Sequence, residues 1–484
     1  MRDVAIAQSL NHKLTRLLDE IDDYFRGKGF VNDVKHFHRV AQELKTARRM
    51  LETLVQTISD EITATMDEML PVYYHQCFAS LPDELLASIL EESGNDPVDM
   101  QMVSRRFYHL VSSLPRLWTT IRHRAQGDQW NLALERSCEQ ILDVDILVDE
   151  LTPREVQALR PHWHRVGKLM LEACDEHTET MNKHFSSLGT MHRLRQLSLD
   201  LCLLDGDEDV HPNAGYTFYE DWHTPNLTEL AVTNIIPVPF GGMSLKHLDM
   251  RLSDAEDAGD WDVTKLHTLL TSCQALRQMS IEFENAAALI GEFGPVELPL
   301  LRYFKLTLAR DVVSNNPSFV EFASNVTITN VEEMHIVTTD LAAVDVNPFL
   351  VLVLIFSSST RFPNLTILDI SVKTGGWFQW TIFSCLPKLS YYAIEAPGLD
   401  IFAGGILSIK TFPPLRTICF RHCHMADLAF FKFLFECLPD ELTQGVEDSP
   451  GHKIVIQLKG CSHLSRETME QLGDTFGICV EGQF

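Results

Sequence analysis

The sequence predicts an α+β protein in which helices at the amino-terminal end precede a longer, repetitive α/β region. Apolar residues at helical spacing dominate residues 2–125, whereas an apolar–x–x–apolar–x–apolar motif recurs from about residue 138 onward. The last two apolar positions of this motif are two residues apart, as in a β-strand that points both side chains to one side. We therefore expect helices first and many short strands afterwards.

Two helices are expected within residues 1–74. Apolar positions at helical spacing cover residues 10–25, a break containing two glycines follows, and a second apolar face covers residues 44–66. Pro71 fits a position at or after the end of the second helix. An antiparallel hairpin and a coiled coil with another chain are both compatible with this pattern, because the segment holds few regular heptads.

The stretch from residue 81 to residue 118 has a helix-start signal. Ser80 can cap the helix, Pro82 fits its first turn, and Asp83 and Glu84 favour the positive end of the helix dipole. About forty residues bury too little surface to be stable alone, so the stretch is expected to pack on a partner or a neighbouring domain. On pattern alone, a helical hairpin within a larger core explains it equally well.

This stretch resembles an F-box, whose pattern is Leu-Pro-x-Glu-Leu-Leu near the start and Val-x-basic-basic-aromatic before a terminal Leu-Trp. The matching residues are Leu81, Pro82, Glu84, Leu85, Leu86, Val103, Arg105, Arg106, Phe107, Leu117 and Trp118. The match covers under a tenth of the 484 residues. It departs in the middle, where Val98–Met102 replaces the usual leucine-rich helix and Ser104 stands where the family has Cys.

The recurring motif appears eleven times, from Ile141-Val144-Ile146 to Leu415-Ile418-Phe420, and successive starts are 18 to 34 residues apart. It resembles the leucine-rich repeat, in which a short strand lines one face and a helix or loop returns on the other. A repeat cannot bury its apolar face alone, so the copies must stack. Together the resemblances imply an N-terminal helical hairpin and a helical F-box followed by an irregular leucine-rich-repeat α/β solenoid.

The domain organisation follows from these segments. We expect an N-terminal helical hairpin or coiled coil at 1–74, the F-box at 75–125, and a leucine-rich-repeat-like solenoid with a C-terminal cap at 126–484. A helical pattern at 465–476 is the expected cap, since the ends of stacked repeats need to be covered.

Composition restricts the partners and the compartment. The formal charge of −27 repels phosphate backbones, and no run of Lys and Arg indicates a basic patch, so nucleic acid is not expected as a partner. The same charge favours basic partner proteins. The longest apolar run, Phe349–Phe356, is too short to span a bilayer, so no membrane is expected either. Eleven cysteines without C-x-x-C pairs indicate a reducing compartment, the cytoplasm or the nucleus.

Candidate chemistry is sparse. The Cys and His residues within 419–424 lack the ligand spacing of a zinc site, and alternating Asp205, Asp207 and Asp209 lack the glycine and glutamate of a calcium loop. Phosphate-cradling, dinucleotide and nucleophile-elbow motifs are absent from the sequence. We therefore expect no metal, no cofactor and no enzymatic activity. An enzyme would need a Cys/His site, with Cys423 and His424 as the residues to test.

The resemblance to fungal-type F-box proteins with leucine-rich repeats implies a substrate-recognition adaptor subunit of a Skp–cullin–F-box ubiquitin ligase. The F-box would dock on a Skp-type adaptor and, through it, on cullin, while the repeats would bind an unknown target protein. Residues expected to form the F-box interior or contact the adaptor, two sets that the pattern does not separate, are Leu81, Pro82, Leu85, Leu86, Ile89, Val103, Phe107 and Trp118. The alternative hypothesis is a protein-interaction scaffold outside any ligase.

Outward positions of the expected strands are the candidate target surface. Arginine and tyrosine are enriched where few residues supply most of the binding energy. The target-binding candidates are Arg195, Arg302, Tyr303, Tyr391 and Arg416.

Overall fold

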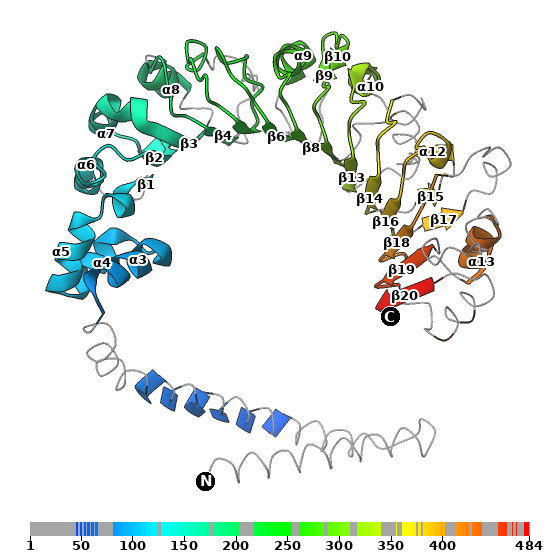
Figure 1. The fold of residues 1–484 in the computed structure, drawn as a ribbon, viewed down its shortest axis with the longest axis horizontal. Coiled ribbons are helices and arrows are strands. Elements are labelled where there is room, and N and C mark those ends of the chain that lie inside the picture. Colours follow the sequence, from blue (N-terminus) through cyan, green and yellow to red (C-terminus); the bar gives the residue numbers. More distant parts are fainter. Residues whose placement is uncertain are drawn as a thin grey trace. The chain divides into compact units, whose positions relative to one another are not determined.

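Figure 1 shows the computed structural model. It describes residues 81–122, 127–174, 178–186, 188–202, 217–253, 261–284, 289–309, 317–339, 361–373, 376–378, 381–397, 399–401, 413–424, 428–437, 454–461 and 479–483, together with single positions and short pieces within 45–65 and at 355, 467 and 471. The expected helix pair at 1–74 and the expected cap helix at 465–476 lie mostly outside these residues. The chain forms two compact units, residues 1–100 and residues 101–484.

The first unit contains helix α3 (Asp83–Ser93) and most of α4 (Pro97–Val103). Asp83 and Glu84 occupy the first turn of α3, as expected, but Pro82 takes the N-cap position and supplies no side-chain cap. Gly94 ends the helix at φ 65°, a left-handed conformation that glycine adopts without steric cost. The described positions between 45 and 65 are helical.

Short helices open the second unit. They are α5 (Arg105–Ser113), the 3₁₀ helix η2 (Pro115–Trp118) and, after strand β1 (Thr120–Arg122), α6 (Gly127–Arg136). Ser104 caps α5 by accepting a hydrogen bond from the Phe107 N–H at 3.3 Å. The indole N–H of Trp118 donates to the Val111 carbonyl oxygen at 2.8 Å, and the Arg136 guanidinium lies 4.6 Å from the Trp118 ring centroid. These contacts fix η2 against its neighbouring helices.

One large sheet dominates the second unit. Its order is β1-β2-β3-β4-β5-β6-β8-β11-β13-β14-β16-β18-β19-β20, and every neighbouring pair is parallel. The strands after β1 are β2 (Leu142–Leu147), β3 (Val166–Cys174), β4 (Gln196–Cys202), β5 (Glu229–Thr233), β6 (His247–Ser253), β8 (Gln278–Glu284), β11 (Tyr303–Ala309), β13 (Glu333–Thr339), β14 (Ile367–Val372), β16 (Tyr391–Glu395), β18 (Thr417–Arg421), β19 (Val455–Lys459) and β20 (Cys479–Gln483).

Helices and two-stranded pairs connect these strands. The helical connections are η3 (Val148–Glu150), α7 (Pro153–Leu159), η4 (Arg160–Arg165), α8 (Thr178–Phe185), α9 (Val263–Ser272), α10 (Pro317–Asn325), α12 (Thr381–Ser384) and α13 (Leu428–Cys437). The small parallel pairs join β7 (Trp261–Asp262) with β9 (Leu289–Ile290), β10 (Val296–Glu297) with β12 (Val326–Thr327), and β15 (Gly376–Phe378) with β17 (Leu399–Ile401). A capping box, in which Thr152 and Glu155 each accept from the other's backbone N–H, starts α7.

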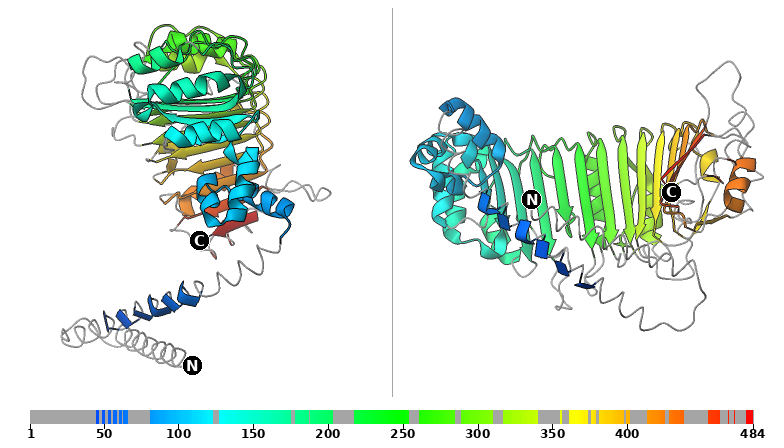
Figure 2. Two further views of the ribbon diagram at one scale, coloured as in Figure 1. Left: turned by 90° about the vertical axis from the view of Figure 1, so that its left-hand side faces the viewer. Right: turned by 90° about the horizontal axis from the view of Figure 1, so that it is seen from below.

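The core of the second unit lies between the sheet and its outer helices. Within residues 101–484 the sheet curves, with the strands on the inner side and α7, α8, α9, α10 and α13 on the outer side (Figure 1), and Figure 2 shows the strands side by side. Alternate residues of each strand point outward to the helices, as Leu197, Leu199 and Leu201 of β4 do, and are buried. Trp222 joins this core and donates its indole N–H to the Phe185 carbonyl oxygen at 2.9 Å. Most side chains on the inner side are half-buried or exposed, although Thr307, Ala393 and Cys419 are buried.

The expected fold class, an N-terminal helical hairpin and helical F-box followed by an irregular leucine-rich-repeat α/β solenoid, is wrong. The structure has one large parallel sheet of fourteen strands with α/β character. The strands hydrogen-bond to their neighbours in chain order without interruption, and the first of them, β1, lies inside the segment 75–125 that was expected to be helical. The positions of eleven strands of this sheet, those from β2 to β18 in its order, were predicted correctly. In each of the eleven motif copies, the last two apolar residues are buried within a strand.

Candidate binding surface on the sheet

Backbone hydrogen bonds align one residue before each strand into a row along the sheet. The N–H of each member donates to the carbonyl oxygen of the member before it, at 2.7–2.9 Å. We call this the edge row, and its members are Arg195, Thr228, Lys246, Arg277, Arg302, Glu332, Thr366, Ser390 and Arg416. Four of its first five residues are cations, and all four are exposed. We call Arg195, Lys246, Arg277 and Arg302 the basic edge row.

A shallow groove of about 470 Å³ lies on the open face beside the basic edge row. Small side chains form its middle, among them Ser198, Ala231 and Ser280 from β4, β5 and β8. Gln196 donates to Glu229 Oε2 at 2.7 Å on one wall, and Tyr303 closes the end on β11. Hydrogen-bonding side chains, small side chains and the carboxylate of Asp249 therefore line the groove together.

A charged network occupies the face across β13 to β18. Its members are Glu333, His335, Asp369, Glu395 and Arg421. His335 lies 2.7 Å from Glu333 Oε1 and 3.5 Å from Asp369 Oδ2, and the same Asp369 pairs with Arg421. Hydrogen bonds first with Asp369 and then with Glu333 raise the pKa of His335, although partial burial opposes them. The network therefore favours a positively charged imidazole.

The target-binding candidates lie on the edge row or the open face, but they do not form one site. Arg195 and Arg302 belong to the basic edge row, whereas Arg416 lies farther along the edge row, before β18. Tyr303 and Tyr391 are half-buried on the face, and burial is the main cause that raises the pKa of each phenol. The five residues are spread from β4 to β18, so the sheet presents them as separate parts of a long surface.

The target-binding candidates selected from the sequence did not include the residues that connect these parts. Arg277 and Lys246 complete the basic edge row, and His335 lies at the centre of the charged network. An alignment of the motif copies would have indicated them. Lys246 and Arg277 each come one residue before a strand, and His335 comes two residues after the first residue of β13. That alignment depends on the lateral register, which a single copy does not reveal.

The adaptor-binding candidates fall into exposed and buried sets. Leu85 is 54% exposed, Ile89 44% and Val103 54%, whereas Leu86, Phe107 and Trp118 are at most 7% exposed. Pro82 is also exposed, and Leu81 is half-buried. The residues up to Ile89 belong to the first unit, and Val103, Phe107 and Trp118 to the second. Only the exposed set can contact a partner without unfolding its own unit.

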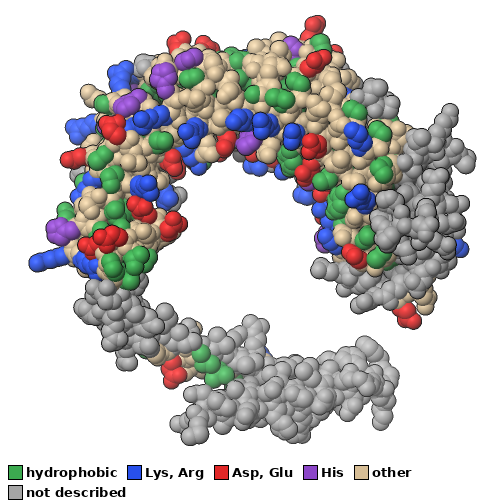
Figure 3. Space-filling view, in the orientation of Figure 1, with side chains coloured by type: hydrophobic (Ala, Val, Ile, Leu, Met, Phe, Trp, Pro, Cys, Tyr) green, Lys and Arg blue, Asp and Glu red, His purple; other side chains and the backbone are tan. Residues whose placement is uncertain are grey.

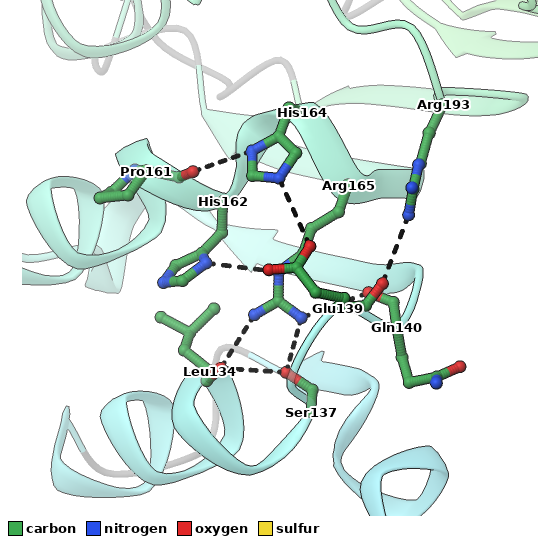
Figure 4. Close-up of polar contacts among 9 residues, drawn as sticks. All are labelled: Leu134, Ser137, Glu139, Gln140, Pro161, His162, His164, Arg165 and Arg193. Carbon is green, nitrogen blue, oxygen red and sulfur yellow. Dashed lines mark hydrogen bonds and ion pairs between the residues drawn. The ribbon is translucent and has the colours of Figure 1, made fainter.

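A buried cation links α6 to the start of the sheet. Arg165, at the end of η4, is 1% exposed, and its guanidinium donates to the carbonyl oxygens of Leu134 at 2.8 Å and Gln140 at 3.2 Å and to Ser137 Oγ at 2.9 Å (Figure 4). The Leu134 carbonyl lies in the last turn of α6, where a cation is favoured by the helix dipole. Burial lowers the pKa of Arg165. This contact is structural, because its donors point into the protein.

Further polar groups surround Arg165 on the solvent side. His162 Nδ1 accepts from Arg165 Nε at 3.3 Å, His164 lies 3.9 Å from the Glu139 carboxylate, and Arg193 donates to the Glu139 carbonyl oxygen at 3.3 Å (Figure 4). Burial is the main cause that lowers the pKa of His162. These contacts hold Arg193 close to the first members of the edge row.

Comparison with known proteins identifies no relative: no protein-family model matches the chain, and no curated protein sequence matches it significantly. Among the residues that the structure describes, no three His, Cys, Asp or Glu side chains come together in a way that could hold a metal ion. The described helices include none that is long and apolar enough to cross a bilayer.

Proposed function

We propose that this chain is a non-catalytic receptor subunit that binds a target protein on the open face of its sheet. The observation that carries this proposal is the inner face of the fourteen-stranded sheet, over which no described helix of residues 101–484 lies. Within the described part of residues 101–484, the helices lie on the outer side and leave the polar and aromatic side chains of the inner face accessible (Figure 1). A broad face with a groove, exposed arginines and half-buried tyrosines is typical of a protein-binding surface.

The proposal extends to an adaptor partner through residues 81–118. Leu85 and Ile89 are four residues apart on α3 and both exposed, so they form an apolar stripe of the kind that a second polypeptide covers. The resemblance of this stretch to an F-box supports a Skp-type adaptor, and through it cullin, as that partner. In such an assembly the chain would position a target near a ubiquitin carrier, so that proximity rather than its own chemistry accelerates transfer.

A cytoplasmic or nuclear location belongs to the same proposal. No disulfide bond joins any of the nine cysteines that the structure describes, and several of them, such as Cys273 and Cys419, are buried as small apolar residues. Several cysteines without disulfide bonds are typical of a protein in a reducing compartment. A protein-interaction scaffold outside any ligase would have the same target-binding face and the same location. It would differ in not binding cullin through the adaptor.

The experiment that tests the proposal is co-elution of the full chain with a Skp-type adaptor and cullin at micromolar concentration. We expect a complex that Leu85→Asp with Ile89→Asp abolishes. The matched control is Leu300→Asp with Ile290→Asp, because these side chains are 51% and 45% exposed and the charge added is the same. A complex with the adaptor but without cullin would favour the scaffold. No complex with the adaptor, or equal loss in both variants, would contradict the adaptor role.

A further inference from the structure

We propose that the basic edge row binds an acidic segment of the target protein, an extended run of Asp and Glu. This inference rests on the proposed function, because it names the chemistry of the partner for the same face. The four cations come from separate repeats of the motif, yet they lie side by side with only Thr228 between the first two. Figure 3 shows Lys and Arg side chains following one another along the inner rim of the second unit.

The basic edge row has few counterions among the residues that the structure describes. Among the described residues, no carboxylate lies within ion-pair distance of Arg195, Lys246 or Arg277. Arg302 has Glu332 Oε1 at 3.9 Å, but both side chains are mostly exposed, so water screens the pair. Exposed like charges repel one another in the free protein, and a bound anion relieves that repulsion.

The row continues into a cleft of about 550 Å³ at its β4 end. The described residues that line this cleft are Ile141, His192, Arg193, Arg195, Asn226, Thr228 and Lys246, and none of them is a carboxylate. The Asn226 amide donates to the His192 carbonyl oxygen at 2.7 Å, which holds this wall in place. Positive charge is therefore concentrated where the row begins.

Negative charge also lies on the face, beyond the basic edge row. Acidic residues, such as Glu229, Asp249 and Glu282, lie on the face beyond the basic edge row. A wide polyanion such as a nucleic acid would meet these carboxylates as well as the cations, and the chain as a whole carries −27. A narrow acidic peptide lying along the edge avoids them. Charge complementarity thus favours a peptide as the occupant.

The dimensions of the row match such a peptide. Four steps of neighbouring strands separate β4 from β11, and at about 4.8 Å a step they span about 19 Å. An extended chain rises about 3.3 Å per residue, so about six residues cover the row. Successive side chains of an extended segment point to opposite sides, so alternate carboxylates reach the cations and the others remain in solvent.

The test uses the full chain and a fluorescein-labelled glutamate peptide of about ten residues, long enough to span the row. Fluorescence anisotropy is measured at low and at physiological salt, with a glutamine peptide and an oligothymidylate of the same length in parallel. The row variant is Lys246→Glu with Arg277→Glu. The control is Lys183→Glu with Lys432→Glu, which changes the charge equally on exposed positions of the outer helices α8 and α13. Circular dichroism confirms that both variants are folded.

We expect the glutamate peptide to bind at micromolar concentration, more weakly as salt rises, and at least about tenfold more weakly to the row variant than to the control. Equal binding to both variants, no binding of the glutamate peptide, or binding of oligothymidylate alone would overturn the inference. Co-elution with the adaptor does not involve these cations. If the chain forms the adaptor complex but does not bind the glutamate peptide, this inference is therefore overturned and the proposed adaptor role remains intact.

Discussion

The imidazole of His335 lies against the carboxylate of Asp369, with Nδ1 3.5 Å from Oδ2, and its other nitrogen lies 2.7 Å from Glu333 Oε1. The Tyr303 ring covers one side of the imidazole, with the two ring centroids 5.3 Å apart. Because both carboxylates favour the protonated ring, the pKa of His335 is raised. A titrating group with a specific geometry thus lies within the proposed target surface.

The stability of the protein should depend on His335 as pH changes. A raised folded-state pKa stabilises the fold fully below the unfolded value of about 6.5, and this contribution is lost as pH rises through the folded-state pKa. We expect His335→Gln to remove that part of the decline in melting temperature that wild type shows as pH rises above about 6.5. His109→Gln, at an exposed position of α5, is the control. Parallel pH curves for wild type and H335Q would contradict the prediction.

Replacing Arg165 with Met should destabilise the second unit. The change leaves the Leu134 and Gln140 carbonyl oxygens and Ser137 Oγ without this donor in a buried site. We expect the free energy of unfolding to fall by about 3 kcal/mol, since buried acceptors without a partner cost about 1–3 kcal/mol each and some will find other donors. Urea denaturation measures the change. Arg195→Met, at an exposed position, should stay within about 0.5 kcal/mol of wild type.

Two neighbouring leucines on α3 should respond differently when each is replaced by aspartate. Leu86 is 0% exposed and Leu85 54%, so Leu86→Asp buries a carboxylate and Leu85→Asp does not. We expect L86D to lose hydrogen-exchange protection throughout Asp83–Ser93, and L85D to keep protection close to that of wild type. Mass spectrometry of exchanged peptides from this helix makes the comparison. Similar protection in both variants would show that the buried and exposed faces of α3 are assigned incorrectly.

Local elements of this fold could be predicted from the sequence, because each depends on a short pattern. The spacing of Leu230 and Val232 is sufficient to indicate β5, and Asp83 with Glu84 marks the first turn of α3. The joining of fourteen strands into one sheet could not be predicted, since pairing depends on contacts between residues far apart in sequence. β1 shows this, because three residues without the motif become a strand by pairing with β2.

The candidate surface was predicted only in part for the same reason. Arg195 and Arg302 are recognisable as outward positions of single motif copies, but their neighbours Lys246 and Arg277 become neighbours only through the register. The net charge of −27 gave no indication of the basic edge row. Its cations are also far apart in the sequence, so they form no run of Lys and Arg. The total charge of a chain therefore does not exclude a local surface of the opposite sign.

Asn234, directly after β5, should contribute to stability through both its backbone conformation and its side-chain hydrogen bond. It adopts φ 58°, it is 4% exposed, and its amide donates to the Leu201 carbonyl oxygen at 2.9 Å. Alanine loses the hydrogen bond and also strains the left-handed backbone, so we expect Asn234→Ala to cost about 2–4 kcal/mol of unfolding free energy. Glycine tolerates this φ and loses only the side-chain contacts, so Asn234→Gly should cost about 1 kcal/mol less than alanine. Urea denaturation of both variants measures the difference, and equal stabilities would show that the backbone conformation of Asn234 is not strained for alanine.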